Sequence, residues 1–288
     1  MGLEYKTNRF VKIFGDPDHP ILGNVVVVPP PPTPSFTPSS TPAVTPTPTP
    51  TATPPFNPGS LSGMIAWYDT NDSGTIALSG SKVTRISDKS GNNFHLEQSN
   101  ASYQPTYSSD TIGTYIEFDG ASTTRLSNTT ISGYSSITAT TKFMVFQKRS
   151  SYSNEEMLLE FADNYRLHYY WSNYGSSETF HGYDYPGPRW TGIFSDAKYP
   201  EYLNWVFMTK PTPYNFDGEL NDTTYNSGPA DNWGPVNLNR LSLGARANGG
   251  NPASFLCREV LLYDRELTST EINQVESYLK TKWNYGAW

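Results

Sequence analysis

A block of thirty residues, 29–58, constrains the whole chain because it contains 13 of the 24 prolines and no charged residue. Each proline fixes φ and removes a backbone hydrogen-bond donor, so neither a helix nor a sheet can run through the block. Thr and Pro alternate over 45–51, a pattern that favours polyproline II, in which about thirty residues at ~3.1 Å each span roughly 90 Å. The sequence therefore predicts a Pro/Thr-rich extended linker over residues 29–60.

The charge of the chain lies outside this linker and excludes several classes of protein. The 288 residues include 20 Lys and Arg against 27 Asp and Glu, for a net charge of −7. Because phosphate neutralisation needs clustered cations, an acidic chain without a Lys/Arg cluster is not expected to bind nucleic acid. No apolar run approaches the ~18 residues of a membrane span, so no membrane insertion is expected. The single cysteine, Cys257, excludes an internal disulfide and is expected to be a small buried hydrophobe.

The segment before the linker, residues 1–28, is too short to hold a core of its own. Its apolar residues are expected to dock on another protein, for example by adding a strand. The candidate docking residues are Phe10, Ile13, Phe14, Ile21, Leu22, Val25, Val26, Val27 and Val28. A disordered tail is the alternative, although such a tail rarely carries so many large apolar residues. Residues 1–14 contain no apolar h-region, so no signal peptide is predicted.

Residues 61–288 form the predicted globular domain. Short runs of alternating apolar residues recur in it, separated by turn signals such as Asp119-Gly120 and Asn248-Gly-Gly250. Strands are expected at 63–68, 115–118, 137–147, 157–161, 165–171, 202–209, 241–244 and 255–263. Many short strands with regular turns indicate an all-β fold, an antiparallel β-sandwich or jelly roll.

One C-terminal helix is expected after the last strand. Thr268-x-x-Glu271 forms a capping box, which marks a helix start. The apolar residues that follow are spaced by three, four and four positions, and they form one stripe that we expect to pack on the sandwich. These residues are Ile272, Val275, Leu279 and Trp283.

Several short motifs of residues 61–288, taken in order, resemble those of the laminin-G-like and concanavalin A-like jelly-roll domains. They include Ala66–Asp69, Asp88–Asn92, Ile116–Gly120, Leu243–Arg246, Glu259–Leu267 and Tyr278–Trp283. The middle, residues 148–235, fits this pattern poorly. The resemblance implies a lectin-like sandwich. The Asp residues of the motifs, such as Asp88 and Asp119, are expected to accept hydrogen bonds from turn amides.

The fold class implied by the resemblance also contains glucanases, so a suitably spaced pair of carboxylates would indicate an enzyme. Retaining glycosidases need two carboxyl groups about 5–5.5 Å apart, and the jelly-roll glucanases supply them as Glu-x-Asp-x-x-Glu. Here Glu117-Phe-Asp119 is followed by Gly-Ala-Ser122, so the last carboxylate is missing. Glu155 and Glu156 are adjacent and would face opposite sides of a strand. An enzyme is therefore not expected, and no catalytic residue is assigned.

No metal site or cofactor is expected either. The four His residues are scattered without a metal-ligand spacing. Asp69-x-Asn71-x-Ser73-Gly74 is similar to the start of a calcium loop, but Gly80 stands where such a loop requires Glu. A calcium site whose ligands come from loops far apart in the sequence remains an alternative.

The region between Tyr165 and Trp190 contains nine aromatic residues. In a strand, Leu167 and Tyr169 would face the core and His168 and Tyr170 the other side. Mixed aromatic and polar surfaces suit sugars, because C–H faces stack on rings while hydroxyls form hydrogen bonds. The candidate carbohydrate-binding residues are His168 and Tyr170 in the strand, and Tyr174, His181, Tyr183, Asp184, Tyr185 and Trp190, which are expected in loops. The alternatives are that these residues fill a sandwich edge or contact a protein.

The three segments together predict a display protein. The best hypothesis is a phage virion protein, a capsid decoration or fibre protein made in the host cytoplasm. Residues 1–28 would bind capsid or tail proteins, and residues 61–288 would bind surface glycans at the virion surface. The alternatives are a structural cement protein without glycan binding, a glycan-cleaving enzyme and a bacterial surface adhesin. No heptad repeat predicts a coiled coil, and a homo-oligomer stays open.

Overall fold

The computed structural model describes residues 56–149, 156–162, 167–174, 177–184, 189–195, 203–212, 215–220, 223–226 and 236–284, with only the backbone path over 167–236. Contacts within the chain divide it into two units, Met1–Ala52 and Thr53–Trp288, and the described residues all belong to the second. The predicted docking segment, residues 1–28, and the predicted linker up to residue 55 lie outside the described residues.

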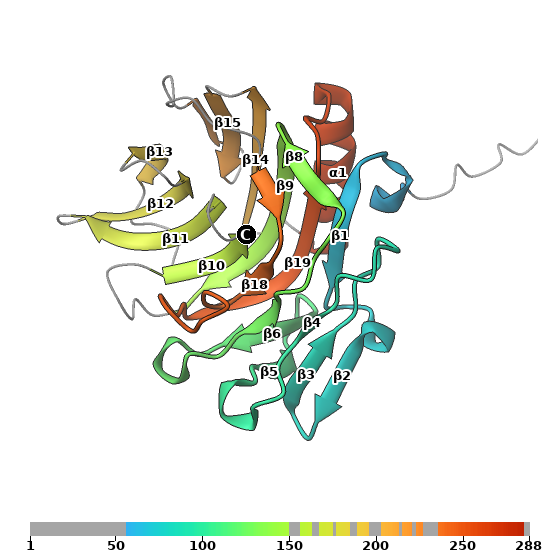
Figure 1. The fold of residues 1–288 in the computed structure, drawn as a ribbon, viewed down its shortest axis with the longest axis vertical. Helices are drawn as coiled ribbons and strands as arrows, with labels where there is room; N and C mark the ends of the chain where they lie inside the picture. The colour runs from blue at the N-terminus through green and yellow to red at the C-terminus, as the bar shows by residue number, and fades with distance from the viewer. Residues whose placement is uncertain are drawn as a thin grey trace, which may run out of the picture. The chain divides into compact units, whose positions relative to one another are not determined.

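One layer of the fold is an antiparallel sheet built around the last strand (Figure 1). Its strands, in the order in which they pair, are β1 (Met64–Asp69), β19 (Phe255–Tyr263), β9 (Thr140–Lys148), β14 (Leu203–Thr212), β15 (Asn215–Leu220) and β16 (Thr223–Asn226). Strands far apart in the sequence lie side by side, since β19 is placed between β1 and β9.

The second layer continues from short strands into the aromatic-rich middle of the chain. Its strands, in pairing order, are β4 (Leu96–Glu97), β7 (Leu126–Asn128), β18 (Leu241–Leu243), β10 (Glu156–Phe161), β11 (Leu167–Tyr174), β12 (Ser177–Asp184) and β13 (Arg189–Ser195). All of these pairings are antiparallel.

A connecting group of strands joins the two layers into one curled sheet. It consists of β2 (Ile76–Ser79), β3 (Lys82–Ile86), β5 (Thr106–Ser109) and β6 (Thr114–Phe118). β3 pairs with β2, β4 and β5, while β6 pairs with β5 and with β19. β8 (Tyr134–Ile137) and β17 (Val236–Leu238) form a separate pair. The predicted all-β sandwich is confirmed, and each strand range expected from the sequence overlaps an observed strand.

Successive side chains of β19 point to opposite faces of the sheet, and both faces are covered. Val260 and Leu262 are fully buried in the core between the layers, together with Phe161 of β10. Leu261 and Tyr263, which alternate with them, pack against the C-terminal helix instead. A strand that is covered on both faces carries apolar residues at consecutive positions, and no polar residue interrupts residues 260–263.

The C-terminal helix, α1 (Ser269–Lys282), lies along β1 and β19 (Figure 1). Its predicted capping box is present, because Thr268 accepts a hydrogen bond from Glu271 and the Glu271 side chain accepts one from Thr268. Val275, Leu279 and Trp283 are buried against the sheet, which confirms the predicted stripe. Within the described residues, no helix has the length and apolar character needed to cross a membrane.

The folded part begins a few residues before position 61. Phe56 packs edge-on against Tyr278 of α1, with ring centroids 6.3 Å apart. A 3-10 turn, Pro58–Ser60, follows, and Asn57 caps it by accepting a hydrogen bond from the N–H of Gly59. The Tyr263 hydroxyl donates to the carbonyl of Pro58 at 3.2 Å. Residues 56–60 are thus anchored on the sandwich.

The turns between strands use the aspartates as the sequence predicts. Asp88 Oδ1 accepts hydrogen bonds from the backbone N–H groups of Trp67 and Ser90, each at 2.9 Å. Gly91 has a φ of +92°, so the turn needs a glycine there. Asp119 caps another 3-10 turn, Gly120–Ser122. The burial of Cys257 is also confirmed, and that burial raises the pKa of its thiol.

Candidate functional site

The aromatic-rich middle of the chain forms the consecutive strands β11, β12 and β13. Their register brings five of the predicted carbohydrate-binding residues together. His168 stands directly opposite Tyr183, and Tyr183 stands opposite Trp190, in one row across three strands. Tyr170 stands opposite His181 in the neighbouring row. Directly opposed positions, and positions two apart on one strand, share a face of a sheet, so all five positions lie on one face.

The pairing of β11 with β10 identifies that face. Leu167 of β11 stands opposite Phe161, which lies in the core between the layers. Glu160, the neighbour of Phe161, stands opposite His168. Because alternate positions face opposite sides, the row that contains Glu160 and His168 lies on the face away from this core. We name the five positions on this face, His168, Tyr170, His181, Tyr183 and Trp190, the candidate surface.

The other predicted residues are placed differently. Tyr174 ends β11, four positions after Tyr170 and therefore on the same face. Asp184 stands opposite Arg189, one position beyond Tyr183, so the pleat assigns it to the other face. Tyr185 lies outside the described residues.

The expectation that the residues from Tyr174 onward occupy loops is wrong for most of them. Tyr174, His181, Tyr183, Asp184 and Trp190 all belong to strands. The strand signal is weak because apolar and polar residues do not alternate in β12, and Gly182 interrupts it. A register irregularity between His181 and Gly182 marks the same place in the pairing with β13.

A second polar cluster joins α1 to β1 and β19. Glu259 is buried, and its two carboxylate oxygens accept four hydrogen bonds. The donors are Trp67 Nε1 at 2.8 Å, Tyr278 Oη at 2.9 Å, Lys282 Nζ at 2.8 Å and Trp283 Nε1 at 2.7 Å. Asp69 stands directly opposite Glu259 in the register, and Lys282 also pairs with it at 2.6 Å. One ammonium therefore separates two facing carboxylates.

The charges of this cluster follow from burial and from its cations. Burial disfavours the ionised form of Asp69, but Lys282 and Lys89 outweigh it and hold the pKa of the carboxyl below its usual value. Burial raises the pKa of the Glu259 carboxyl, against the attraction of Lys282. Only 6% of the Asp69 side chain and 17% of the Lys282 side chain are exposed. The members of the cluster come from α1, β1 and β19, so the cluster fastens α1 to the sheet.

Three other carboxylates of the described part that could serve a glycosidase also have structural partners. Asp119 accepts hydrogen bonds from the N–H of Ala121 and the hydroxyl of Ser122, each at 2.9 Å. Glu117 lies 3.6 Å from Arg149. Glu156 is fully buried and paired with Lys148. Each of these carboxylates serves a turn or an ion pair.

The segment that is similar to a calcium loop binds a lysine instead. Lys89 Nζ lies 2.9 Å from both Asp69 and Asp72. Asp72 is the fourth position of the segment, which supplies no calcium ligand in such a loop. Among the described residues, no three His, Cys, Asp or Glu side chains come together in a way that could hold a metal ion.

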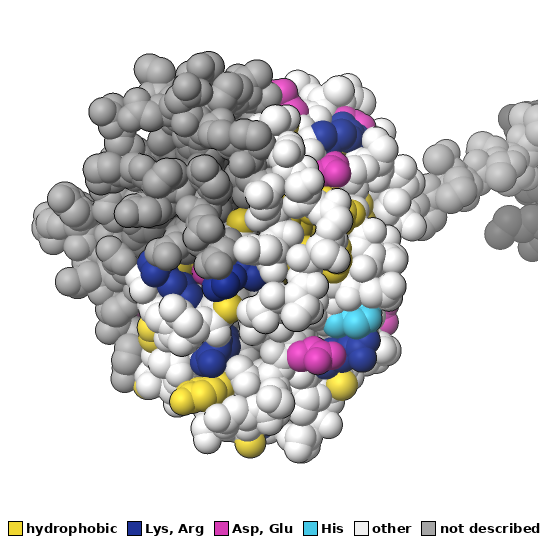
Figure 2. Space-filling model, viewed as in Figure 1, with side chains coloured by type: hydrophobic (Ala, Val, Ile, Leu, Met, Phe, Trp, Pro, Cys, Tyr) yellow, Lys and Arg dark blue, Asp and Glu magenta, His cyan; other side chains and the backbone are white. Residues whose placement is uncertain are grey.

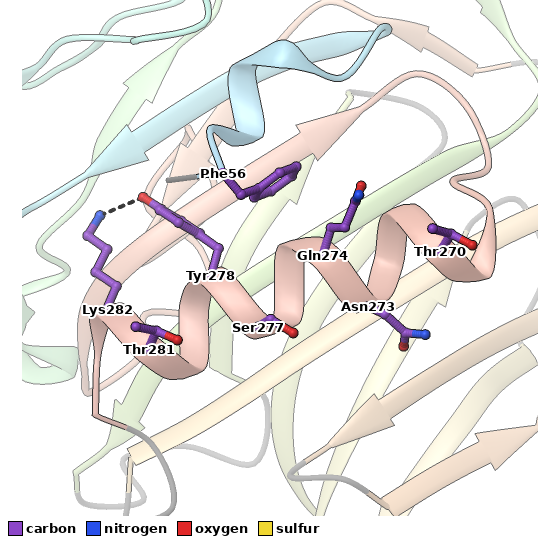
Figure 3. A pocket seen from close by; sticks show the side chains of 8 residues that line it. All are labelled: Phe56, Thr270, Asn273, Gln274, Ser277, Tyr278, Thr281 and Lys282. Carbon is purple, nitrogen blue, oxygen red and sulfur yellow. Dashed lines mark hydrogen bonds between the residues drawn. The ribbon is translucent and has the colours of Figure 1, made fainter. Parts of the chain in front are cut away.

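A shallow groove of about 740 Å³ lies on α1 (Figure 3). Phe56 and Tyr278 form its aromatic wall, and uncharged polar side chains of the helix form the rest. These are Thr270, Asn273, Gln274, Ser277 and Thr281, with Lys282 at one end. Lys282 is already engaged by Glu259 and Asp69, so the groove offers no free charge of its own.

No protein-family model matches the sequence, and no curated protein matches it. Solved structures do match the fold. The binding domain of botulinum neurotoxin serotype G is 11% identical with a TM-score of 0.56, and the match covers 76% of this chain and 51% of that one. The binding domain of botulinum neurotoxin DC in complex with SialylT is 12% identical with a TM-score of 0.53, over 77% of this chain and 52% of that one.

A glycosidase has the same kind of similarity. A GH54 α-L-arabinofuranosidase is 14% identical with a TM-score of 0.53, over 70% of this chain and 51% of that one. This chain therefore matches about half the length of these structures. At such identities the matches establish a shared lectin-like sandwich fold, which binding domains and enzymes both use.

Proposed function

We propose that residues 61–288 form a carbohydrate-binding module without catalytic activity. The observation that carries this proposal is the register that places His168, Tyr183 and Trp190 in one row and Tyr170 and His181 in the next. Rings of this kind stack on the C–H faces of sugars, and their imidazole and phenol groups exchange hydrogen bonds with hydroxyls. The similar binding domain of botulinum neurotoxin serotype D, solved in complex with N-acetylneuraminic acid, supports the same reading of the fold.

The test is a glycan array probed with the full chain, followed by titration of the glycans that bind. Tyr183→Ala and Trp190→Ala should each weaken binding about fivefold to tenfold, because each removes one stacking ring. Leu78→Ala is the matched control, since Leu78 is a large apolar residue that is 46% exposed on β2. Unchanged affinity in both aromatic variants would contradict the site, and a chain that binds no glycan would contradict the function.

We further propose that residues 1–28 attach the chain to the capsid or tail of a phage particle and that the linker up to residue 55 holds the module away from it, at the virion surface. The support is the order of the segments: an apolar peptide, an uncharged Pro/Thr spacer and a lectin-like domain. Deleting residues 1–28 should abolish association with particles and leave glycan binding intact. Association that survives the deletion would contradict the anchor. Particles that become unstable without the chain, combined with no glycan binding, would instead favour a cement protein.

A further inference from the structure

Arg246 lies in the loop between β18 and β19, next to the candidate surface. The loop closes on itself, since Arg246 N–H donates to the carbonyl of Gly250 at 2.9 Å and Gly249 N–H donates to the carbonyl of Arg246 at 2.7 Å. The following residue, Ala247, donates its N–H to Glu160 Oε2 at 2.7 Å. Glu160 stands opposite His168 in the register. The loop is therefore attached to the row that carries the candidate surface.

The guanidinium of Arg246 has no partner among the residues that the structure describes. Its Nε is buried without a hydrogen bond, and it takes part in no ion pair. The Nε of Arg258 is also buried without a hydrogen bond. Arg246 differs from Arg258 and Arg265 in the missing ion pair, since those two bind Asp110 and Glu271, each at 2.6 Å. Arg246 is half-buried, and a guanidinium that no described carboxylate pairs keeps its planar N–H donors available to an anion.

A second cation lies against the same loop. Arg125 Nη1 lies 3.2 Å from the point that a Cβ at Gly249 would occupy, and Arg246 Cδ lies 3.4 Å from the corresponding point at Gly250. Gly249 has a φ of +88°, so the turn needs a residue without a side chain there. Figure 2 shows several Lys and Arg side chains on the face in view.

We propose that Arg246 binds the anionic group of an acidic saccharide held on the candidate surface. This inference deepens the proposed function and rests on it. The planar fork of a guanidinium donates two parallel hydrogen bonds to a carboxylate or a sulfate ester, and Arg125 adds attraction without needing contact. The sugar ring would lie over the aromatic positions, and its charged group would point to the loop.

The experiment compares saccharides that differ only in charge. The full chain is first probed on an array of neutral, carboxylated and sulfated glycans and is then titrated with lactose, sialyllactose and sulfated lactose. At least one acidic sugar should bind about tenfold tighter than lactose, since a hydrogen bond to a charged group contributes roughly that factor. Arg246→Gln should remove this preference, and Arg246→Lys should retain part of it. The acidic sugar that responds distinguishes a carboxylate from a sulfate.

Arg85→Gln is the matched control, because it makes the same charge change at a cation that already pairs with Glu97. If Arg246→Gln and the parent chain unfold at the same midpoint, a loss of binding is due to the changed side chain and not to a loss of folding. Equal affinity for lactose and the acidic sugars, or a preference that survives Arg246→Gln, would overturn the inference while the proposed function stands. A chain that binds no glycan of any class would overturn both.

Discussion

The two ends of the sandwich use their charged residues in opposite ways. At the helix end, the buried Glu259 and Asp69 pair with Lys282 and Lys89, which come from other elements of the fold. At the loop end, Arg246 and Arg125 flank a glycine turn, and Arg246 has no partner within the described residues. Satisfied polar groups hold elements in place, whereas an unsatisfied one is available to a ligand. The contrast separates the part of the domain that maintains the fold from the part that we propose binds sugar.

Glu259→Ala should have the largest effect, because it removes the acceptor of four hydrogen bonds and leaves Lys282 and the two indoles without it. We expect the free energy of unfolding to fall by about 3–5 kcal/mol, the usual cost of breaking a buried ion pair. Denaturation in urea measures it. Glu97→Gln is the control, since 61% of that side chain is exposed, and it should change stability by less than about 0.5 kcal/mol. A loss below 1 kcal/mol would mean that α1 stays attached without the cluster.

Gly244→Ala tests the loop end. Gly244 has a φ of +89°, and a Cβ there would meet Phe118 Cδ1 at 2.1 Å and the backbone oxygen of Thr124 at 2.6 Å. We expect a loss of roughly 2–4 kcal/mol, since strain and overpacking add. Gly80→Ala is the matched control, with a φ of +62° and nothing within 4 Å, and it should cost about 1 kcal/mol. Equal losses in the two variants would show that packing at Gly244 is unimportant.

Thr268→Ala removes the N-cap of α1 and should lower stability by about 1 kcal/mol, the usual value for a capping threonine. The loss should be visible as a lower unfolding midpoint in urea. Thr268→Ser keeps the hydroxyl that accepts from Glu271 N–H and should restore most of it. If Ser and Ala behave alike, the capping box contributes nothing.

The smallest expected effect is a loss of stability at acidic pH. Arg265 and the backbone of Thr268 lower the pKa of Glu271 to about 2, below the ordinary value near 4.5. A lowered pKa means that the stabilisation is present above about pH 4.5 and is lost as the pH falls towards 2. Asp69, whose pKa is also lowered, acts in the same direction. Unfolding midpoints between pH 2.5 and 6 should therefore fall with acid, and Glu271→Gln should show a shallower fall. A parallel pair of curves would exclude a role for Glu271.

The sequence predicts the end of the domain well because its signals are local. The alternation of Leu261 with Leu262, the capping box at Thr268 and the stripe ending at Trp283 each depend on residues within a few positions of one another. The sequence does not predict the cluster around Glu259, since Trp67 lies 192 positions away from Glu259 in the chain and no periodicity encodes that contact.

The sequence predicts the candidate surface only in part. The residue types around Tyr170 and Tyr183 suggest a sugar site, but only the antiparallel pairing places His168 opposite Tyr183 and Asp184 on the other face. The role proposed for Arg246 follows from the lack of an ion pair with any described residue, and such a property has no sequence signal.

The packing of Phe56 beside Tyr278 has a mechanical consequence. A pull on the segment before Phe56 would reach the domain at this ring pair and at the hydrogen bond from Tyr263 to Pro58. Behind them, β1 is paired along its length with β19, which is itself held by β9. Tension along β1 would load these hydrogen bonds together in shear instead of opening them one by one. When the domain is bound to a surface, a pulling force on the segment before Phe56 would act at the helix end, and these hydrogen bonds would resist it together.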